Sequence, residues 1–137
     1  FAHEVQTIER GEVAAALDRR LEQADRSLAV CLQVNTSGEA SKSGVAPADL
    51  VELARQVATL ERVQITGLMT IATRGGDERE ARRCFRLLAT LRDQVRAEAI
   101  SGVGMDELSM GMSGDLEWAI DEGSTTVRVG TAIFGNR

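Results

Sequence analysis

Two hydrophobic periodicities alternate along this chain, and that alternation restricts its possible folds more than any other feature. Short apolar runs of strand length are each followed by a segment in which apolar residues recur every third or fourth position, as on one face of a helix. Strands are predicted at residues 4–8, 27–34, 63–72, 106–110 and 125–130. Strands that alternate with helices are typical of a parallel sheet with right-handed crossovers.

Helical segments fit between and after these strands. They are predicted at residues 10–24, 47–60, 77 to about 95, 115–122 and from 131 onward. Asp77 is placed to cap the third helix, and Gly123 can end the fourth. The inner face of the third helix is expected to consist of Ala81, Cys84, Phe85, Leu88, Leu91 and Val95.

Two parallel architectures remain open, an open doubly wound sheet and a (β/α)8 barrel. No strand is followed by a GxGxxG fingerprint, so a dinucleotide-binding fold has little support. Five strands cannot close an eight-stranded barrel, which takes about 250 residues. If the fold is a barrel, about three βα units are missing from its front, and the first strand seen here is the fourth.

Composition describes one domain of 137 residues, of which 43% are hydrophobic, with no apolar run that could span a bilayer. The net charge of −5 argues against nucleic-acid binding. The first residues lack the pattern of a signal peptide, and they also lack an initiator Met, which indicates a fragment or a processed product. We expect a cytoplasmic protein without membrane or nucleic-acid partners.

Few residues are available for metal or nucleophilic chemistry. Cys31 and Cys84 are interpreted as buried hydrophobes in a reducing compartment, and His3 is the only histidine, so no metal site is predicted. Lys42 is the only lysine, so any covalent imine chemistry in this chain depends on it. Its polar loop favours an exposed or ion-paired lysine instead.

Ligands of parallel α/β folds meet the carboxyl ends of the strands, so candidate binding residues are expected at those ends. Four of them carry polar or small residues: Asn35–Ser37, Met69–Ile71, Ser109–Ser113 and Arg128–Thr131.

The segment from Ser109 to Gly114 has two interpretations. It is either a tight turn in which Ser113 caps the next helix, or a phosphate-binding loop at that helix. Arg128 is a lone charge between two valines, and its burial requires either a salt bridge or a ligand contact.

Three stretches together resemble a known family. "QVNTSGEASKSGV", "ITGLMTIA" and "ELSMGMSGDLEWAIDEGSTTVRVGTAIFG" look like successive motifs of the pyridoxal 5′-phosphate (PLP) homeostasis proteins, the YggS-like or PLP-binding-protein family. The resemblance implies a (β/α)8 TIM barrel of the alanine racemase N-terminal-domain type, fold type III. Residues 1–137 would be the C-terminal part of that single domain, about strands 4–8.

The resemblance also implies a PLP site at the ends of the last two strands. Arg128 would face the pyridine nitrogen and keep it unprotonated, which makes the ring a poorer electron sink. The phosphate would be surrounded by Ser109, Met110, Ser113, Gly130 and Thr131, and Asn35 and Met69 would line the ring or its edges.

One departure from the family bears on function. The family's Schiff-base lysine lies on the first barrel strand, which this chain lacks, and Lys42 matches the "SKSG" loop instead. Five strands would leave two raw sheet edges and an open apolar interior, so an upstream segment or a partner chain is expected to complete the barrel.

Three functions follow from these observations. The leading one is a non-enzymatic carrier or regulator in PLP homeostasis, with no catalytic residues. The alternative is a PLP-dependent amino-acid racemase or lyase completed by an upstream segment or a partner chain. Racemases related to this family add a second domain and a catalytic tyrosine, and this chain has no tyrosine. The third is a phosphate-binding barrel module without PLP.

Overall fold

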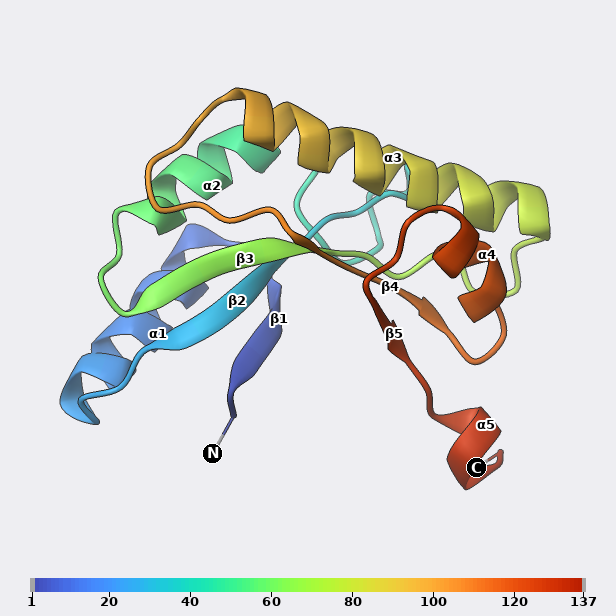
Figure 1. Ribbon diagram of the computed structural model, residues 1–137, viewed down its shortest axis with the longest axis horizontal. Coiled ribbons are helices and arrows are strands. Elements are labelled where there is room, and N and C mark those ends of the chain that lie inside the picture. The colour runs from blue at the N-terminus through green and yellow to red at the C-terminus, as the bar shows by residue number, and fades with distance from the viewer. Residues whose placement is uncertain (1, 137) are drawn as a thin grey trace.

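Five parallel strands form one sheet in the order in which they occur in the sequence (Figure 1). The computed structural model describes residues 2–136. The strands are β1 (Glu4–Ile8), β2 (Leu28–Gln33), β3 (Val63–Met69), β4 (Glu107–Met112) and β5 (Thr126–Arg128). A doubly wound sheet reverses its strand order at a switch point, whereas consecutive order is that of a barrel wall. The fold is therefore an incomplete barrel.

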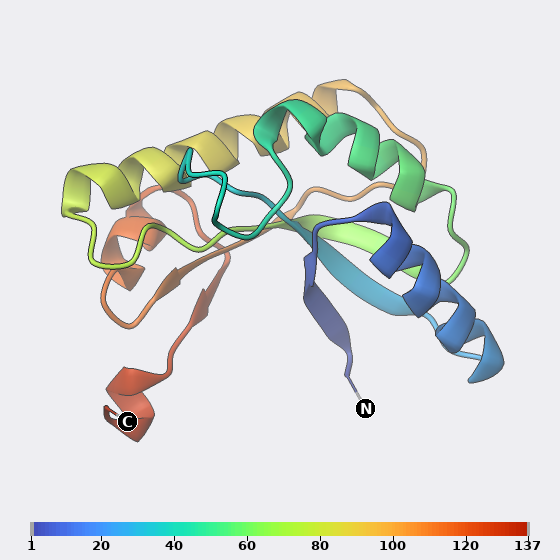
Figure 2. The same cartoon turned by 180° about the vertical axis from the view of Figure 1, so that it is seen from behind.

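In the described part of the chain, four helices cover the convex face of the curved sheet, whereas a fifth lies beyond the end of β5, as Figures 1 and 2 show from opposite sides. They are α1 (Gly11–Gln23), α2 (Leu50–Ala58, preceded by a 3-10 turn at Pro47–Asp49), α3 (Glu78–Ala97), α4 (Leu116–Asp121) and α5 (Thr131–Phe134). Within residues 2–136, no helix combines the length and the apolar character needed to cross a bilayer.

The order and faces of these elements confirm the sequence prediction. All six residues predicted for the inner face of α3 are buried. Asp77 caps this helix, because its carboxylate accepts the backbone N–H of Glu80 at 2.9 Å. The core between the sheet and the helices consists of aliphatic strand residues together with the helix residues Val57, Phe85 and Leu88. Along each strand, these core residues alternate with residues that point to the concave face of the sheet.

Three strand ends differ from the prediction by two residues or more, and one of them is that of β5, which ends at Arg128, two residues before its predicted end. β3 ends at Met69, three residues before the predicted end, and β4 continues to Met112, two residues beyond its predicted end. Gly111 permits the extension, because its φ is +105° and a Cβ atom there would lie 2.7 Å from the Ala119 side chain of α4. The bare backbone at Gly111 thus accommodates a helix of the same chain.

The concave face of the sheet is polar at its centre, which corrects the expectation of an apolar interior. On β4, Leu108 and Met110 point into the helix-covered core, so Glu107 and Ser109 point to the other face. Six inward-facing residues form what we term the interior polar belt: Glu4, Gln6, Thr66, Glu107, Ser109 and Thr126.

Hydrogen bonds join this belt across the sheet. Ser109 Oγ donates to Gln6 Oε1 at 2.6 Å, which links β4 to β1 although two strands lie between them. Glu107 accepts from Thr126 Oγ1 at 3.0 Å and from Thr66 Oγ1 at 3.3 Å, which adds β5 and β3. Gln6 Nε2 donates to Glu4 at 2.6 Å. The belt spans the concave face from one sheet edge to the other.

Cys31 lies buried beside this belt. Its Sγ and the carboxylate oxygens of Glu4 and Glu107 lie within 4.8 Å of one another. Burial, with Glu107 and Glu4 nearby, raises the pKa of the Cys31 thiol far above its ordinary value. Cys84 is also buried, within the helix-side core, so the predicted burial of both cysteines is confirmed, although Cys31 faces the polar belt and not that core.

Candidate cofactor-binding site

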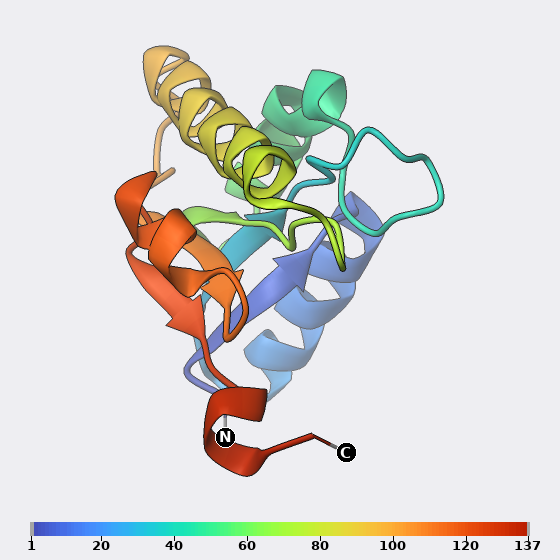
Figure 3. The ribbon, with the colours of Figure 1, turned by 90° about the vertical axis from the view of Figure 1, so that its right-hand side faces the viewer.

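The loops that follow β2, β3 and β4 gather at one end of the sheet, where the carboxyl ends of parallel strands meet (Figure 3). Arg128, the last residue of β5, is partly buried at this end. Its Nη2 donates to the Thr70 backbone oxygen at 2.7 Å. Burial lowers the pKa of Arg128, and the negative charge of Asp115 partly opposes this shift.

Within the described residues, the Arg128 side chain has no salt bridge that would explain its burial. No carboxylate among residues 2–136 lies within ion-pair distance of its guanidinium. Its Nε is the one buried side-chain nitrogen or oxygen in that range without a hydrogen-bond partner. Buried donors are normally paired, so this N–H requires an acceptor that the described residues do not supply.

Ser113 connects the ends of β4 and β5. Its Oγ accepts the backbone N–H groups of Gly130 and Ala132, each at 3.2 Å. Ser113 does not cap α4, whose N-cap is Asp115; that carboxylate instead accepts the Met112 N–H at 2.7 Å. The capping interpretation of Ser113 is therefore wrong, and two backbone donors converge on its hydroxyl oxygen.

The structure separates the other residues predicted around the phosphate. Thr131 is exposed and begins α5, directly after Gly130. The Met110 side chain is fully buried in the core on the helix side of the sheet. Ser109 is also fully buried, and its hydroxyl belongs to the interior polar belt. Ser113, Gly130 and Thr131 thus lie together at the strand ends, while the side chains of Ser109 and Met110 point elsewhere.

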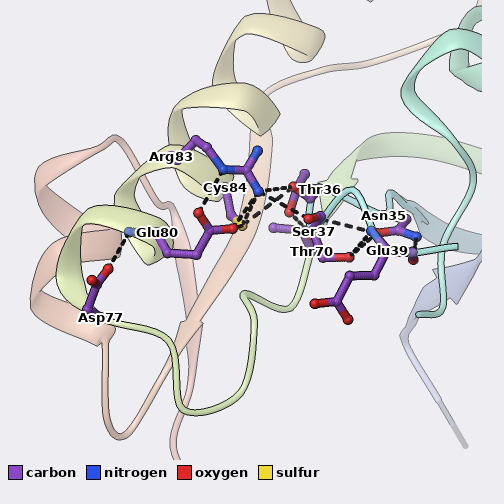
Figure 4. Close-up of polar contacts among 9 residues, drawn as sticks. All are labelled: Asn35, Thr36, Ser37, Glu39, Thr70, Asp77, Glu80, Arg83 and Cys84. Atoms are coloured by element: carbon purple, nitrogen blue, oxygen red, sulfur yellow. Dashed lines mark hydrogen bonds and ion pairs between the residues drawn. The ribbon is translucent and has the colours of Figure 1, made fainter. Parts of the chain in front are cut away.

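Asn35 and Met69 lie at the ends of neighbouring strands. The Asn35 amide folds its own loop: Nδ2 donates to the Glu39 backbone oxygen at 2.7 Å, and Oδ1 accepts from Ser37 Oγ at 2.6 Å (Figure 4). Met69 is buried outside the helix-side core and pairs in register with Ser109. Met69 therefore lies on the same face as the belt, while the side-chain bonds of Asn35 all go to its loop.

Lys42 lies in that loop with half of its side chain exposed, 4.0 Å from a carboxylate oxygen of Glu39. This is the exposed, ion-paired lysine that the sequence favoured. The sequence marks Thr36 and Thr70 only as strand-end residues, yet both side chains are buried and their hydroxyl oxygens lie 2.8 Å apart. No local pattern marks them, because they meet only through the pairing of β2 with β3.

Comparison with known proteins shows which family has this arrangement. Residues 2–137 match the family model described as "Alanine racemase, N-terminal domain". A pyridoxal phosphate homeostasis protein from Vibrio alginolyticus is 45% identical over 133 residues, which cover 97% of this chain and 56% of that protein. A protein of the same description from Schizosaccharomyces pombe is 38% identical and is covered to 56%. The chain spans about half the length of the curated relatives it matches.

Solved structures agree with the fold. A protein of unknown function from Bifidobacterium adolescentis superposes with a TM-score of 0.92 at 42% identity, covering 97% of this chain and 53% of that one. PipY of Synechococcus elongatus, solved with PLP bound, gives 0.87 at 35% identity over 97% of this chain and 61% of its own. Alanine racemase from Clostridium difficile, at 13% identity and a TM-score of 0.78, covers 97% of this chain and 34% of its own and shares the fold.

Proposed function

The chain belongs to the alanine racemase N-terminal-domain family, and from this premise we propose that it binds pyridoxal 5′-phosphate as the C-terminal part, residues 1–137, of a single (β/α)8 barrel domain. Its role is PLP homeostasis as a carrier or regulator, without turnover of its own. The names of its relatives and the PLP-bound PipY structure support this assignment.

The unpaired Nε of Arg128 is the observation that carries the proposal. An arginine nitrogen can only donate, so its partner must be an acceptor held at a buried strand end. The pyridine nitrogen of PLP accepts a hydrogen bond only when it is unprotonated. Arg128 therefore fits the ring and lowers the proton affinity of its nitrogen. PLP supplies an electron sink when bound, and an unprotonated ring is a weak one, in keeping with a carrier.

The phosphate fits the neighbouring strand end. The N–H groups of Gly130 and Ala132 already converge on one oxygen, that of Ser113, and can bind a phosphate oxygen in the same way. Ser113 would then donate its hydroxyl proton to the phosphate, with Thr131 beside it. The Asp115 carboxylate is held by the Met112 N–H, which limits its repulsion of the phosphate.

Completion of the barrel is part of this proposal. β1 and β5 are the two edges of the sheet, and each edge leaves backbone N–H and C=O groups free for pairing. An upstream segment or a partner chain with parallel strands would pair with both edges and supply the covalent lysine. Racemase or lyase activity of the completed protein is the alternative, favoured only by the shared fold.

Titration of the chain with PLP, followed by absorbance and circular dichroism, tests the assignment. We expect saturable binding to the wild-type chain and weakening of at least tenfold in Arg128→Lys, which keeps the charge but loses the Nε donor (about 1.4 kcal/mol). Arg79→Lys, at an exposed position on α3, is the matched control and should bind like wild type. Equal binding by the Arg128 variant would contradict the role given to it, and steady loss of optical rotation from single amino acids would favour the enzyme.

A further inference from the structure

Thr70 is the only hydrogen-bond partner that the Arg128 side chain has among residues 2–136, and it lies one residue beyond the end of β3. A residue outside a strand is not held by the ladder, yet Thr70 is fixed by other bonds. Its N–H donates to the Ser109 oxygen at 3.1 Å, and its Oγ1 donates to the Val34 oxygen at 2.8 Å. Thr70 is therefore held by its N–H and by its side chain, and its carbonyl oxygen remains to accept from Arg128.

The hydroxyl of Thr36 also restrains Thr70. Thr36 Oγ1 lies 2.8 Å from Thr70 Oγ1, and both residues are almost entirely buried. A hydroxyl has one proton, and that of Thr70 is used on the Val34 oxygen, so Thr36 donates and Thr70 accepts. Both hydrogen bonds therefore run in the same direction, from Thr36 to Thr70 and from Thr70 to the Val34 oxygen. Buried hydroxyls with every bond made are rigid, because any rotation would leave one of them unpaired.

Thr36 is itself held from the helix layer, as Figure 4 shows. Arg83 of α3 donates through Nη2 to the backbone oxygens of Thr36 at 3.0 Å and of Ser37 at 3.2 Å. Cys84 Sγ also contacts the Thr36 oxygen, at 3.5 Å. The position of Thr36 is thus set by α3, and that of Thr70 by Thr36 and the strand ends.

We propose that the buried Thr36–Thr70 hydroxyl pair is a positioning device for Arg128, an inference that rests on the proposed PLP site. The guanidinium is planar and rigid, so a carbonyl that fixes Nη2 also fixes the direction in which Nε–H points. Thr36 and Thr70 touch no ligand in this scheme. Their hydroxyls restrain the Thr70 carbonyl. That carbonyl orients the Nε–H of Arg128, which determines the protonation state of the cofactor ring.

Valine substitutions isolate the hydroxyls, because valine keeps the shape of threonine and the Thr70 carbonyl remains present. In Thr70→Val or Thr36→Val, the carbonyl loses part of its support and the guanidinium gains freedom to rotate. Thr66→Val is the matched control: Thr66 lies on β3, and its hydroxyl is directed at the Val30 oxygen and at a Glu107 carboxylate oxygen instead. It removes a hydroxyl from the same strand without touching Arg128.

Nuclear magnetic resonance of the cofactor-free chain gives the first readout. The Nε–H signal of Arg128 is assigned by its loss in Arg128→Lys. In Thr70→Val and Thr36→Val, we expect this signal to shift and its hydrogen exchange to accelerate about three- to tenfold, the effect of one lost hydrogen bond. Thr66→Val should leave it unchanged. An unmoved signal in both test variants would overturn the positioning role.

PLP titration gives the second readout and separates the two proposals. Thr70→Val should weaken PLP affinity about three- to tenfold and raise the pH at which the bound cofactor's absorbance changes, with no further loss when added to Arg128→Lys. A lower melting temperature with an unchanged pH profile would reduce Thr70 to a structural role and overturn the inference. If wild type binds no PLP while the resonance behaves as expected, the proposed function fails and the positioning of Arg128 stands.

Discussion

The Ser113 hydroxyl oxygen accepts the backbone N–H of Gly130 at 3.2 Å, across 17 residues of sequence and between two neighbouring strand ends. A single side chain thus joins the loop after β4 to the start of α5. Removal of the Ser113 hydroxyl should weaken ligand binding more than it destabilises the fold, because Ser113, Gly130 and Ala132 all lie near solvent.

Ser113→Ala should therefore lower PLP affinity by about tenfold, the low end of the range for the loss of one hydrogen bond to an ionised group. Its free energy of unfolding should change by less than about 1 kcal/mol. Arg128→Ala should weaken binding more, because it removes the charged and buried partner of the ring. Ser101→Ala, at an exposed position, serves as control in both titrations. A larger loss in Ser113→Ala than in Arg128→Ala would contradict this ranking.

Gly111→Ala should destabilise the fold by about 2–4 kcal/mol, because alanine is strained at positive φ and its Cβ would collide with Ala119. Chemical denaturation measures this loss directly. Gly114→Ala is the matched control, since no atom lies within 4 Å of a Cβ built there. Similar midpoints for the two variants would show that α4 can move away from β4.

Asp77→Ala should cost about 1 kcal/mol, because α3 loses the side-chain acceptor for the Glu80 N–H. Asp77→Asn retains an acceptor oxygen and should lie within a few tenths of a kcal/mol of wild type. Thermal unfolding of the two variants side by side gives the comparison. If asparagine were as damaging as alanine, the charge of Asp77 rather than its hydrogen bond would be what stabilises α3.

The pH dependence of stability should include a contribution from Glu122. Arg86, followed by Arg82, holds the pKa of this carboxyl below its ordinary value of 4.5. A lowered folded-state pKa adds stability that is fully present above pH 4.5 and is lost as the pH falls through the folded value. Glu122→Gln should thus destabilise the chain at pH 7 and progressively less below pH 4.5.

Lys42 should not become covalently attached to PLP. Half of its side chain is exposed, and its amine lies 4.0 Å from a carboxylate oxygen of Glu39, so it is a surface group and not part of an enclosed site. Borohydride reduction of the chain with PLP, followed by peptide mass mapping, should yield no stoichiometric adduct at this residue. A full adduct would overturn the view that the covalent lysine lies outside these 137 residues.

Local pattern was enough to predict the elements, their order and the buried face of α3, because periodicity reports directly which side of an element is apolar. The position of Arg128 was also predictable, since a charged side chain flanked by valines in a short strand has few possible orientations. The end of β4 was not, because it depends on how closely α4 approaches Gly111.

The polar contacts of the site lay beyond such reasoning for a different reason. The bond between Ser109 and Gln6 joins residues separated by 103 positions, and the pairing of Thr36 with Thr70 depends on the register of two strands. Alternation places Ser109 on the inner face but does not say which side chain opposes it. Hence Ser109 was expected to bind the phosphate, whereas in the structure its side chain belongs to the interior polar belt.

That belt has a consequence for assembly. Because Gln6 of β1 is tied to Ser109 of β4, and Glu107 to β3 and β5, the bend of the sheet is fixed by contacts within this one chain. Any strands that pair with its edges would meet a preshaped template. Their association would follow rigid docking kinetics, with a rate set by encounter and by the charge of Glu4 and Glu107, instead of a slow folding step coupled to binding.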